Sequence, residues 1–392
     1  MPAPPTMNSD SFKPLLLKLI NTPGQFSPED TKLAMHHLAT PGAVLPAQAG
    51  AFLAALKSSC IEHLPETLSA SAEVMREYAL KVPLAEPDVP AVDIVGTGGD
   101  GHNTFNVSTT AAIVAAGAGA RVVKHGNKAS TSSSGSADIL LALGCPLSPP
   151  SSAPEPLPNK PFTFLLAAHH HPALTSLAPV RKALPFRTVF NVLGPLINPA
   201  APSRMILGVY SRDLGPVFAE TLRGMGVQRA LVVCGMESLD EISIAGGTWA
   251  WSLENGEITT TTLHPSHFEL KTHALNTVAG ASPETNAQML VDMLDPARQA
   301  GQSSMTGSEQ GVTSDPAAIL DFVLLNASAL LVVAGLAPDY PSGVRMARES
   351  ISSGRAWEAL QDFKARDVTR ANGRAGGAVT EELGGKTDLL KD

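Results

Sequence analysis

The sequence predicts an α/β fold: a small all-helical domain plus a large α/β domain with a mostly parallel central sheet. Residues 11–85 carry apolar residues at helical spacing and show no strand pattern. From residue 91 the chain runs through a short β-branched segment, a glycine-rich loop, an Ala-rich helix and a second short strand. This order is one βαβ unit and implies a parallel sheet. The length of 392 residues, 44% of them hydrophobic, suits a large domain with a smaller one.

Within the helical part, Ser27-Pro28-Glu29-Asp30 has the features of a helix start. Serine is a good cap, proline fits the first helical position, and acids face the positive helix end. Further strands are predicted at Ala91–Val95, Arg121–Lys124, Phe162–Leu166, Met205–Tyr210 and Ala230–Cys234. Further helices are predicted at Ser108–Gly119, Leu214–Met225, Ala317–Ala334 and Ser342–Ser352.

Three segments are expected to be irregular. Residues 148–161 contain six prolines, which exclude a regular helix. Residues 299–314 are rich in Gly, Ser and Thr and predict a mobile surface loop, and 373–392 predict a solvated tail.

Composition argues against several classes of protein. With 28 basic and 36 acidic residues the net charge is −8, and no Lys/Arg block indicates a nucleic-acid partner. Cys60, Cys145 and Cys234 are widely spaced and form no CxxC pair, so neither a disulfide framework nor a cysteine zinc site is indicated. The N-terminus lacks a signal-peptide pattern, and no uninterrupted apolar stretch reaches about 18 residues. We therefore expect a cytoplasmic protein without a membrane partner.

The first segment with chemical potential is Gly96–Gly101 (GTGGDG) and the helix start that follows it. Glycines after a parallel strand let the backbone approach a ligand closely, and free N–H groups near Ser108 and Thr109 form an anion site. A tight turn with a helix cap is the plain alternative. The loop also matches the dinucleotide pattern G-x-G-x-x-G, but Asp100 inside it would repel a pyrophosphate unless a metal intervenes.

The second segment follows the next strand. Lys124-His125-Gly126-Asn127-Lys128 leads into five consecutive hydroxyl residues, Ser130–Ser134, and then Gly135-Ser136. Loops at the carboxyl ends of neighbouring strands lie where open α/β sheets bind ligands. Lysines and hydroxyls suit a ligand with several phosphate oxygens, although a solvated serine-rich loop would have the same composition.

Two further segments carry acids and histidines. The adjacent Asp240 and Glu241 could hold Mg²⁺ as hard oxygen ligands, or could simply be solvated. His169–His171 lack the spacing of a zinc motif. Downstream, the planar guanidinium of Arg181 suits a substrate carboxylate, with a structural ion pair as the alternative.

Taken together, these segments resemble the anthranilate phosphoribosyltransferase family. The matching strings are DIVGTGGDGHNTFNVST, KHGN, SGSAD, HHPA…APVR, RTVFNVLGPLINPA and LDEIS, in the family's order, between about Phe12 and Phe363. The resemblance implies attack of the anthranilate amine on C1 of 5-phosphoribosyl 1-pyrophosphate (PRPP), with Mg²⁺ as cofactor. The products would be pyrophosphate and N-(5-phosphoribosyl)anthranilate, a tryptophan precursor. A homodimer formed through the helical domain is also implied.

The resemblance assigns roles to residues at matching positions. The phosphosugar would be held by Gly96, Gly99, Asp100, Thr104, Asn106, Ser108, Thr109, Lys124, Ser132 and Ser136. Magnesium would be bound by Ser108, Asp240 and Glu241. Anthranilate would meet Gly96, Asn127 and Arg181, in a pocket shaped by His125, His171 and Pro195. No residue is assigned as a general base.

The resemblance also divides the chain. Residues 168–200 would join 11–85 in the helical domain, and 86–167 with 201–372 would form the α/β domain. The chain departs from the family pattern at Lys128, where Arg is common, and at Ala168, where Pro is usual. Residues 148–161 replace a helix, and 299–314 are longer than usual. Two rivals are a pyrimidine nucleoside phosphorylase, whose phosphate signature is absent here, and a non-catalytic nucleic-acid-binding relative.

Overall fold

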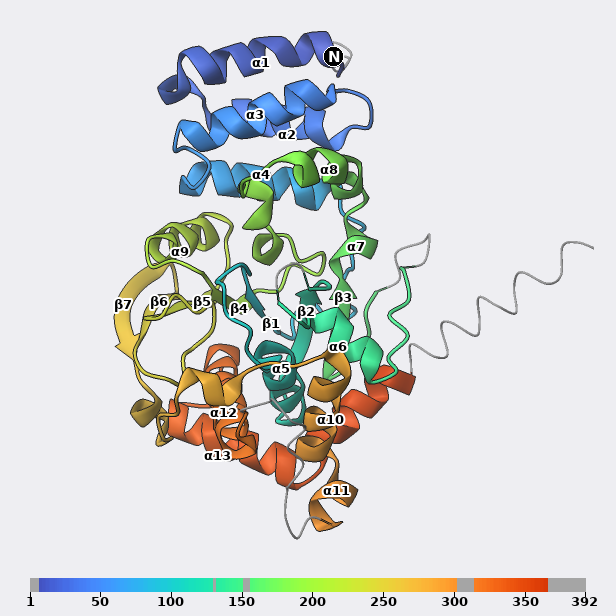
Figure 1. The fold of residues 1–392 in the computed structure, drawn as a ribbon, viewed down its shortest axis with the longest axis vertical. Helices are drawn as coiled ribbons and strands as arrows, with labels where there is room; N and C mark the ends of the chain where they lie inside the picture. The colour runs from blue at the N-terminus through green and yellow to red at the C-terminus, as the bar shows by residue number, and fades with distance from the viewer. Residues whose placement is uncertain (1–6, 130–131, 151–155, 302–313, 366–392) are drawn as a thin grey trace, which may run out of the picture.

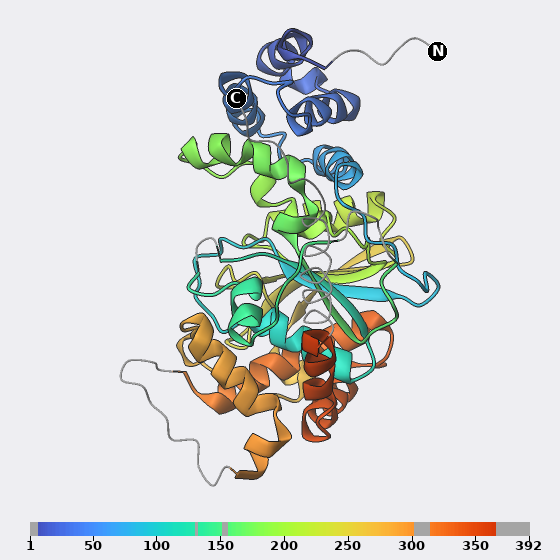
Figure 2. The ribbon, with the colours of Figure 1, turned by 90° about the vertical axis from the view of Figure 1, so that its right-hand side faces the viewer.

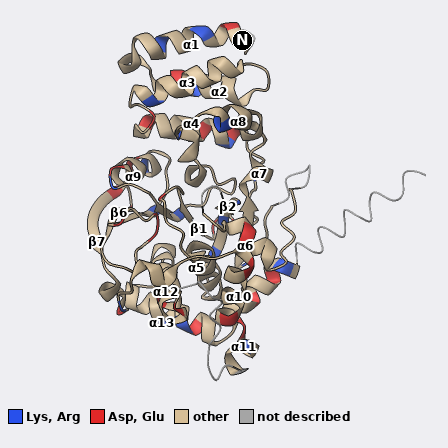
Figure 3. Ribbon diagram, viewed as in Figure 1, with Lys and Arg blue, Asp and Glu red and all other residues tan. Residues whose placement is uncertain are grey.

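The computed structural model describes residues 7–129, 132–150, 156–301 and 314–365. Figures 1 and 2 show three layers stacked along the long axis: a helical bundle, a twisted sheet, and a group of helices beyond the sheet. Charged residues of both signs are scattered over these layers (Figure 3).

The helical bundle contains most of the first 77 residues. Its helices are α1 (Ser9–Asn21), α2 (Pro28–Ala39), α3 (Pro46–Ser58) and α4 (Pro65–Glu77), with a 3-10 turn η1 (Pro23–Gln25). The helix start predicted at Ser27 is confirmed: its hydroxyl accepts from the Asp30 N–H, and the Asp30 carboxylate accepts from the Ser27 N–H. Later in the chain, α8 (Pro172–Ala183) contacts α2 and α3. The limits of the two domains stay a prediction.

In the described part of the chain, the sheet has seven strands in the order β3-β2-β1-β4-β5-β6-β7. The five predicted strands are parallel and are β1 (Ala91–Gly96), β2 (Arg121–Gly126), β3 (Phe162–Leu166), β4 (Arg204–Gly208) and β5 (Arg229–Gly235). Sequence reasoning missed an antiparallel pair at one edge, β6 (Thr248–Glu254) and β7 (Glu257–Leu263). The mostly parallel sheet is confirmed, and the loops that follow β1, β2, β4 and β5 lie at the carboxyl ends of these parallel strands.

Alternate residues of the strands face two different cores. Met205 and Leu207 of β4 belong to a cluster that continues into the bundle and α9 (Leu214–Gly224). Ile206 between them faces the opposite cluster. That second cluster is built from α5 (Val107–Gly117), α6 (Ser136–Ala142), α10 (Pro283–Leu294), α12 (Pro316–Ala334) and α13 (Tyr340–Ser352). The period of two along a strand explains how one sheet supports both layers.

Helix α12 is long and apolar enough to cross a membrane by length and composition. However, 72% of its most apolar window is buried inside the fold. It contacts α5, α13 and the strands β1, β4 and β5. This helix is therefore the central core helix of the layer beyond the sheet.

Short elements connect these layers. They are α7 (Ala167–His170), η2 (Val189–Asn191), η3 (Gly194–Leu196), η4 (Pro265–Phe268), η5 (Leu275–Val278) and α11 (Pro296–Gly301). The prediction of a loop over 299–314 is wrong at its start, because α11 continues to Gly301. This helix begins with Pro296, a residue that suits the first helical position. Residues 302–313, 151–155 and the tail 373–392 lie outside the described residues. The described parts of 148–161 contain no helix.

Candidate active site

Glycines at the ends of two neighbouring strands form the floor of the site. Gly96 of β1 and Gly208 of β4 are paired in register. A Cβ at Gly96 would lie 2.3 Å from the Asp240 carboxylate, and a Cβ at Gly208 would lie 1.6 Å from the Asp240 carbonyl oxygen. Because neither glycine has a side chain, the loop after β5 can lie directly on the strand ends.

This packing brings together acids that are distant in the sequence. Asp240 accepts a 2.6 Å hydrogen bond from the Gly98 N–H, and its own N–H lies 3.4 Å from the Asp100 carboxylate. The Ser108 hydroxyl, at the start of α5, donates to Glu241. The three residues predicted to bind magnesium and the loop acid Asp100 therefore lie at one place.

The electrostatics of these acids favour a bound cation. Desolvation and the neighbouring Asp100 charge raise the pKa of Asp240 well above its usual value. Desolvation also raises the pKa of Glu241 to about 7, although Lys124 opposes the shift. Among the described residues, no three His, Cys, Asp or Glu side chains form a complete metal site. Two carboxylates and a hydroxyl suit Mg²⁺, which usually keeps water and phosphate oxygens as its other ligands.

Beneath the acids lie two buried charged groups, Lys124 and Asp93, whose mutual influence sequence reasoning did not predict. The Lys124 ammonium is 1% exposed and donates to the Ile94 carbonyl. Burial lowers its pKa, while the Asp93 charge opposes this. Asp93 is held by a 2.8 Å hydrogen bond from Asn198, and burial raises its pKa to about 6. The only sequence signal for these buried charges was an aspartate inside a β-branched strand.

The glycine-rich loop after β1 is held by Arg187. Its guanidinium donates to the carbonyl oxygens of Gly98 at 2.9 Å and Gly99 at 2.8 Å. It also stacks on the Tyr210 ring, 4.2 Å from the centroid. Sequence reasoning gave Arg187 no role, because no local pattern links it to a loop so far away.

The start of α5 is joined to the serine-rich loop and to α10. Asn106 precedes the helix, and its amide donates to the Ser134 carbonyl at 2.9 Å. Asn286 of α10, fully buried and not predicted, donates to the Asn106 side chain at 2.9 Å. Thr104 pairs through its backbone with Ala279.

Residues predicted to bind the phosphosugar, Ser132 and Ser136, and Asn127, predicted to contact anthranilate, lie between β2 and the start of α6. Asn127 is exposed, Ser132 donates to the Ser134 carbonyl, and Ser136 is the first residue of α6. The Asp138 carboxylate closes this loop by accepting from the N–H groups of Ala129 and Gly135, at 2.7 and 2.9 Å. The hydroxyls at 130 and 131 lie outside the described residues.

Two buried histidines lie against each other. The rings of His125 and His171 meet edge to face with centroids 5.2 Å apart. Burial lowers the pKa of His125 to about 3 and that of His171 to about 4, so both are neutral at pH 7. Their Nε2 atoms are buried and have no hydrogen-bond partner within the described chain. His125 Nδ1 lies 3.2 Å from the carbonyl of Gly194, the residue before the predicted Pro195.

Arg181 of α8 is a half-buried cation. Its guanidinium lies 5.4 Å from the centroid of the Phe190 ring. No acid among the described residues forms an ion pair with it, and its Nε atom is buried without a partner. An arginine in this state is a ready binding group for a carboxylate.

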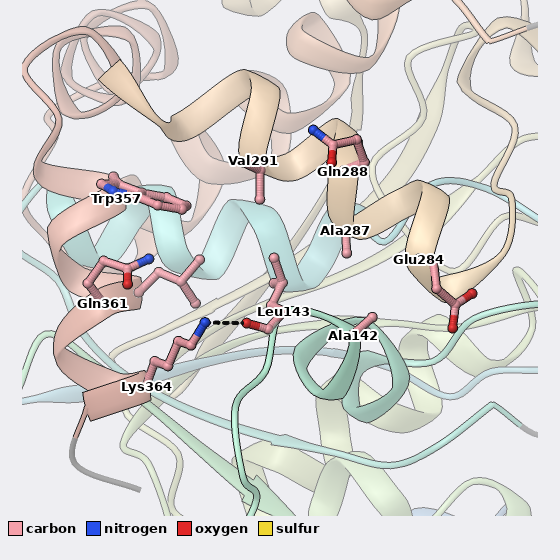
Figure 4. Close-up of a pocket in the computed structure, with 10 residues that line it drawn as sticks. Ala142, Leu143, Glu284, Ala287, Gln288, Val291, Trp357, Gln361 and Lys364 are labelled. Carbon is pink, nitrogen blue, oxygen red and sulfur yellow. Dashed lines mark hydrogen bonds between the residues drawn. The ribbon is translucent and has the colours of Figure 1, made fainter. Parts of the chain in front are cut away.

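A separate pocket of about 230 Å³ lies between α10, the helix over 355–365 and the end of α6 (Figure 4). It is lined by Val291 of α10, by Trp357 from the helix over 355–365, and by the loop after α6, where Lys364 donates to the Leu143 carbonyl at 2.8 Å. None of the predicted site residues lines it. It is therefore distinct from the strand-end site.

Comparisons with known proteins agree with this architecture. Residues 88–357 match the family model "Glycosyl transferase family, a/b domain", and residues 13–79 match "Glycosyl transferase family, helical bundle domain". An anthranilate phosphoribosyltransferase of Schizosaccharomyces pombe is 44% identical over 338 residues, covering 86% of this chain and 91% of the relative. One from Stenotrophomonas maltophilia is 40% identical over 331 residues, covering 84% of this chain and 90% of that one.

Solved structures give the same result. The anthranilate phosphoribosyltransferase of Saccharomyces cerevisiae in complex with PRPP and Mg matches with a TM-score of 0.81 at 33% identity, covering 93% of this chain and 99% of that chain. The same enzyme in complex with 4-fluoroanthranilate matches with a TM-score of 0.79 at 32% identity, with the same coverage. On its sequence, its fold and the chemistry gathered at its strand ends, this chain belongs to the anthranilate phosphoribosyltransferase family.

Proposed function

We propose that this chain transfers the phosphoribosyl group of PRPP to the amine of anthranilate. The amine nitrogen bonds to C1, pyrophosphate leaves, and N-(5-phosphoribosyl)anthranilate forms as a precursor in tryptophan biosynthesis. The observation that carries the proposal is the cluster of Asp240, Glu241 and Ser108, beside the glycine loop and the start of α5. Relatives sharing most of the chain bear this activity in their names, and one was solved with PRPP and Mg.

The phosphosugar side of the site is assigned to the two loops and the start of α5. The residues proposed to hold it are Gly96, Gly99, Asp100, Thr104, Asn106, Ser108, Thr109, Lys124, Ser132 and Ser136. Ser108, Asp240 and Glu241 would hold Mg²⁺, which offsets negative charge on the pyrophosphate leaving group. The Thr109 hydroxyl is buried and has no hydrogen-bond partner among the described residues, which supports this assignment because a buried donor needs an acceptor.

The anthranilate side is assigned to Arg181 and the neutral histidines. Arg181 would pair with the carboxylate, Gly96 and Asn127 would also contact anthranilate, and His125, His171 and Pro195 would form the walls. An aromatic amine is uncharged near pH 7, so no strong base has to deprotonate it before attack. The chain accelerates the reaction chiefly by holding the amine against C1, where the departing pyrophosphate leaves an oxocarbenium-like sugar.

Anthranilate fluorescence tests the activity. The signal should fall when PRPP and Mg²⁺ are both present and stay constant when either is left out. A parallel reaction with a pyrimidine nucleoside and inorganic phosphate tests the phosphorylase alternative and should give no free base. A constant fluorescence signal with folded, full-length protein would refute the proposal.

We further expect a cytoplasmic homodimer that forms through the helical bundle. The apolar side chains of Leu17, Ile20 and Leu45 are 58%, 54% and 55% exposed on this bundle, and such a surface supports an interface.

A further inference from the structure

Arg187 links two separate parts of the site. It lies between α8 and η2, in a segment joined to the helical bundle, whereas its hydrogen-bond acceptors lie in the loop after β1. The guanidinium also stacks on the ring of Tyr210, which lies just after β4. The arginine is therefore fixed on two sides and does not swing freely in solvent.

The conformation of the loop and the position of Arg187 depend on each other. Gly98 and Gly99 both have positive φ, +69° and +72°, which side chains disfavour. A Cβ at Gly99 would lie 1.9 Å from Arg187 Nη1. Two successive glycines thus let the guanidinium reach two successive carbonyl oxygens.

This contact also fixes the direction in which the N–H group of each of these two peptides points. In a trans peptide the C=O and the following N–H point in opposite directions. Because the carbonyls of Gly98 and Gly99 turn toward Arg187, the N–H groups of Gly99 and Asp100 point away from it. No described residue accepts a hydrogen bond from either N–H, whereas the Gly98 N–H donates to the Asp240 carboxylate. The loop therefore presents two adjacent free donors on the side away from the arginine.

We propose that Arg187 is a positioning residue that aims the N–H groups of Gly99 and Asp100 at phosphate oxygens of the phosphosugar substrate. Adjacent backbone N–H groups form a strong anion-binding concavity when both point the same way. Arg187 acts through the loop and does not touch the substrate. The inference rests on the proposed function, because it takes the ligand of this loop to be PRPP.

The test compares Arg187→Ala and Arg187→Lys with a matched arginine that also stacks on an aromatic ring. Arg212→Ala is that control, because Arg212 is exposed, lies 5.0 Å from the Trp249 ring centroid and stacks on a different ring from Arg187. For each full-length variant, KM is measured for both substrates, and PRPP binding with Mg²⁺ is measured by calorimetry without anthranilate.

Arg187→Ala should raise both KM and Kd for PRPP about tenfold or more, because hydrogen bonds to a charged ligand are misaligned. The KM for anthranilate should change little, and millimolar guanidinium should restore part of the PRPP affinity. Arg187→Lys should give an intermediate loss, since an ammonium is a poor match for two fixed carbonyls. Arg212→Ala should behave like the unmodified protein.

Unchanged PRPP affinity, an equal rise in KM for both substrates, or failure of guanidinium to rescue would each overturn the proposal. If Arg187→Ala does not fold, Arg187→Lys provides the test: it should raise the KM for PRPP more than the KM for anthranilate. If the unmodified chain binds PRPP but does not consume anthranilate, the proposed function fails. In that case the calorimetric Kd values for PRPP still test whether Arg187 positions the loop.

Discussion

At the scale of single residues, charges without partners show where ligands are needed. Arg181 is a half-buried guanidinium with no acidic partner in the described chain, and burial lowers its pKa. An arginine remains protonated despite such a shift. The energy of desolvating it is recovered when a carboxylate binds.

Arg181→Ala should raise the KM for anthranilate about tenfold to a hundredfold, the equivalent of one charge-assisted, two-pronged contact. The KM for PRPP should change little. Lys182→Ala is the matched control, because Lys182 is an exposed cation next in the sequence. Steady-state kinetics with each substrate varied decide the matter, and equal changes in both KM values would remove Arg181 from the carboxylate role.

The acids of the site couple magnesium binding to pH. The pKa of Glu241 is raised to about 7 without a cation, so Mg²⁺ must displace a proton below that pH. The apparent Kd for Mg²⁺ should therefore fall about tenfold between about pH 6 and about pH 8. Calorimetric Mg²⁺ titrations at both pH values measure this change, and Glu241→Gln should reduce it. A Kd independent of pH would contradict the assignment of Glu241.

The raised pKa of Glu241 also makes the stability of the folded protein depend on pH. A carboxyl whose folded pKa is raised contributes stability below its unfolded value, near 4.5, and loses that contribution as pH rises through about 7. The protein without cation is thus destabilised by Glu241 at higher pH. Mg²⁺ should consequently raise the Tm more at about pH 8 than at about pH 6.

At the scale of secondary-structure elements, the carboxyl ends of β1 and β4 must lack side chains. Gly208→Ala places a methyl group 1.6 Å from the Asp240 carbonyl oxygen, so backbone has to move. We expect a loss of about 1–3 kcal/mol of unfolding free energy, together with a loss of magnesium-dependent turnover. Urea unfolding and turnover measurements test both.

Gly224→Ala is the control for this change. A Cβ at Gly224, the last residue of α9, meets nothing within 4 Å, so this change should stabilise the protein by about 0.5–1 kcal/mol. If Gly208→Ala matched Gly224→Ala in stability and turnover, close packing on the strand ends would not be required.

The same elements show what local sequence patterns can and cannot predict. The strands β1–β5 are short apolar runs, so their pattern predicted them, and β3 was predicted with its observed bounds. The strand β7 carries four successive threonines and is largely exposed at the edge of the sheet, so it lacked the apolar alternation that identifies a strand. Its pairing with β6 is a tertiary property.

At the scale of the whole molecule, the site could be predicted where a loop carries its own signature. The glycine loop, the lysine–serine segment and the adjacent acids were recognisable as single stretches, and the fold brings the first and third together. Arg187, Asn198 and Asn286 were not, because each acts through a partner distant in the chain. Such pairings leave no local trace, and only the three-dimensional arrangement reveals them.

The late position of α12 in the chain has a consequence for biosynthesis. This helix covers α5 and one face of β1, β4 and β5, yet it begins only at Pro316. A chain still growing on the ribosome therefore exposes the apolar surface of β1, β4 and β5 that α12 later covers. Such a surface invites aggregation or chaperone binding. Synthesis of this protein should thus depend on chaperone supply until the nascent chain has released α12 from the exit tunnel.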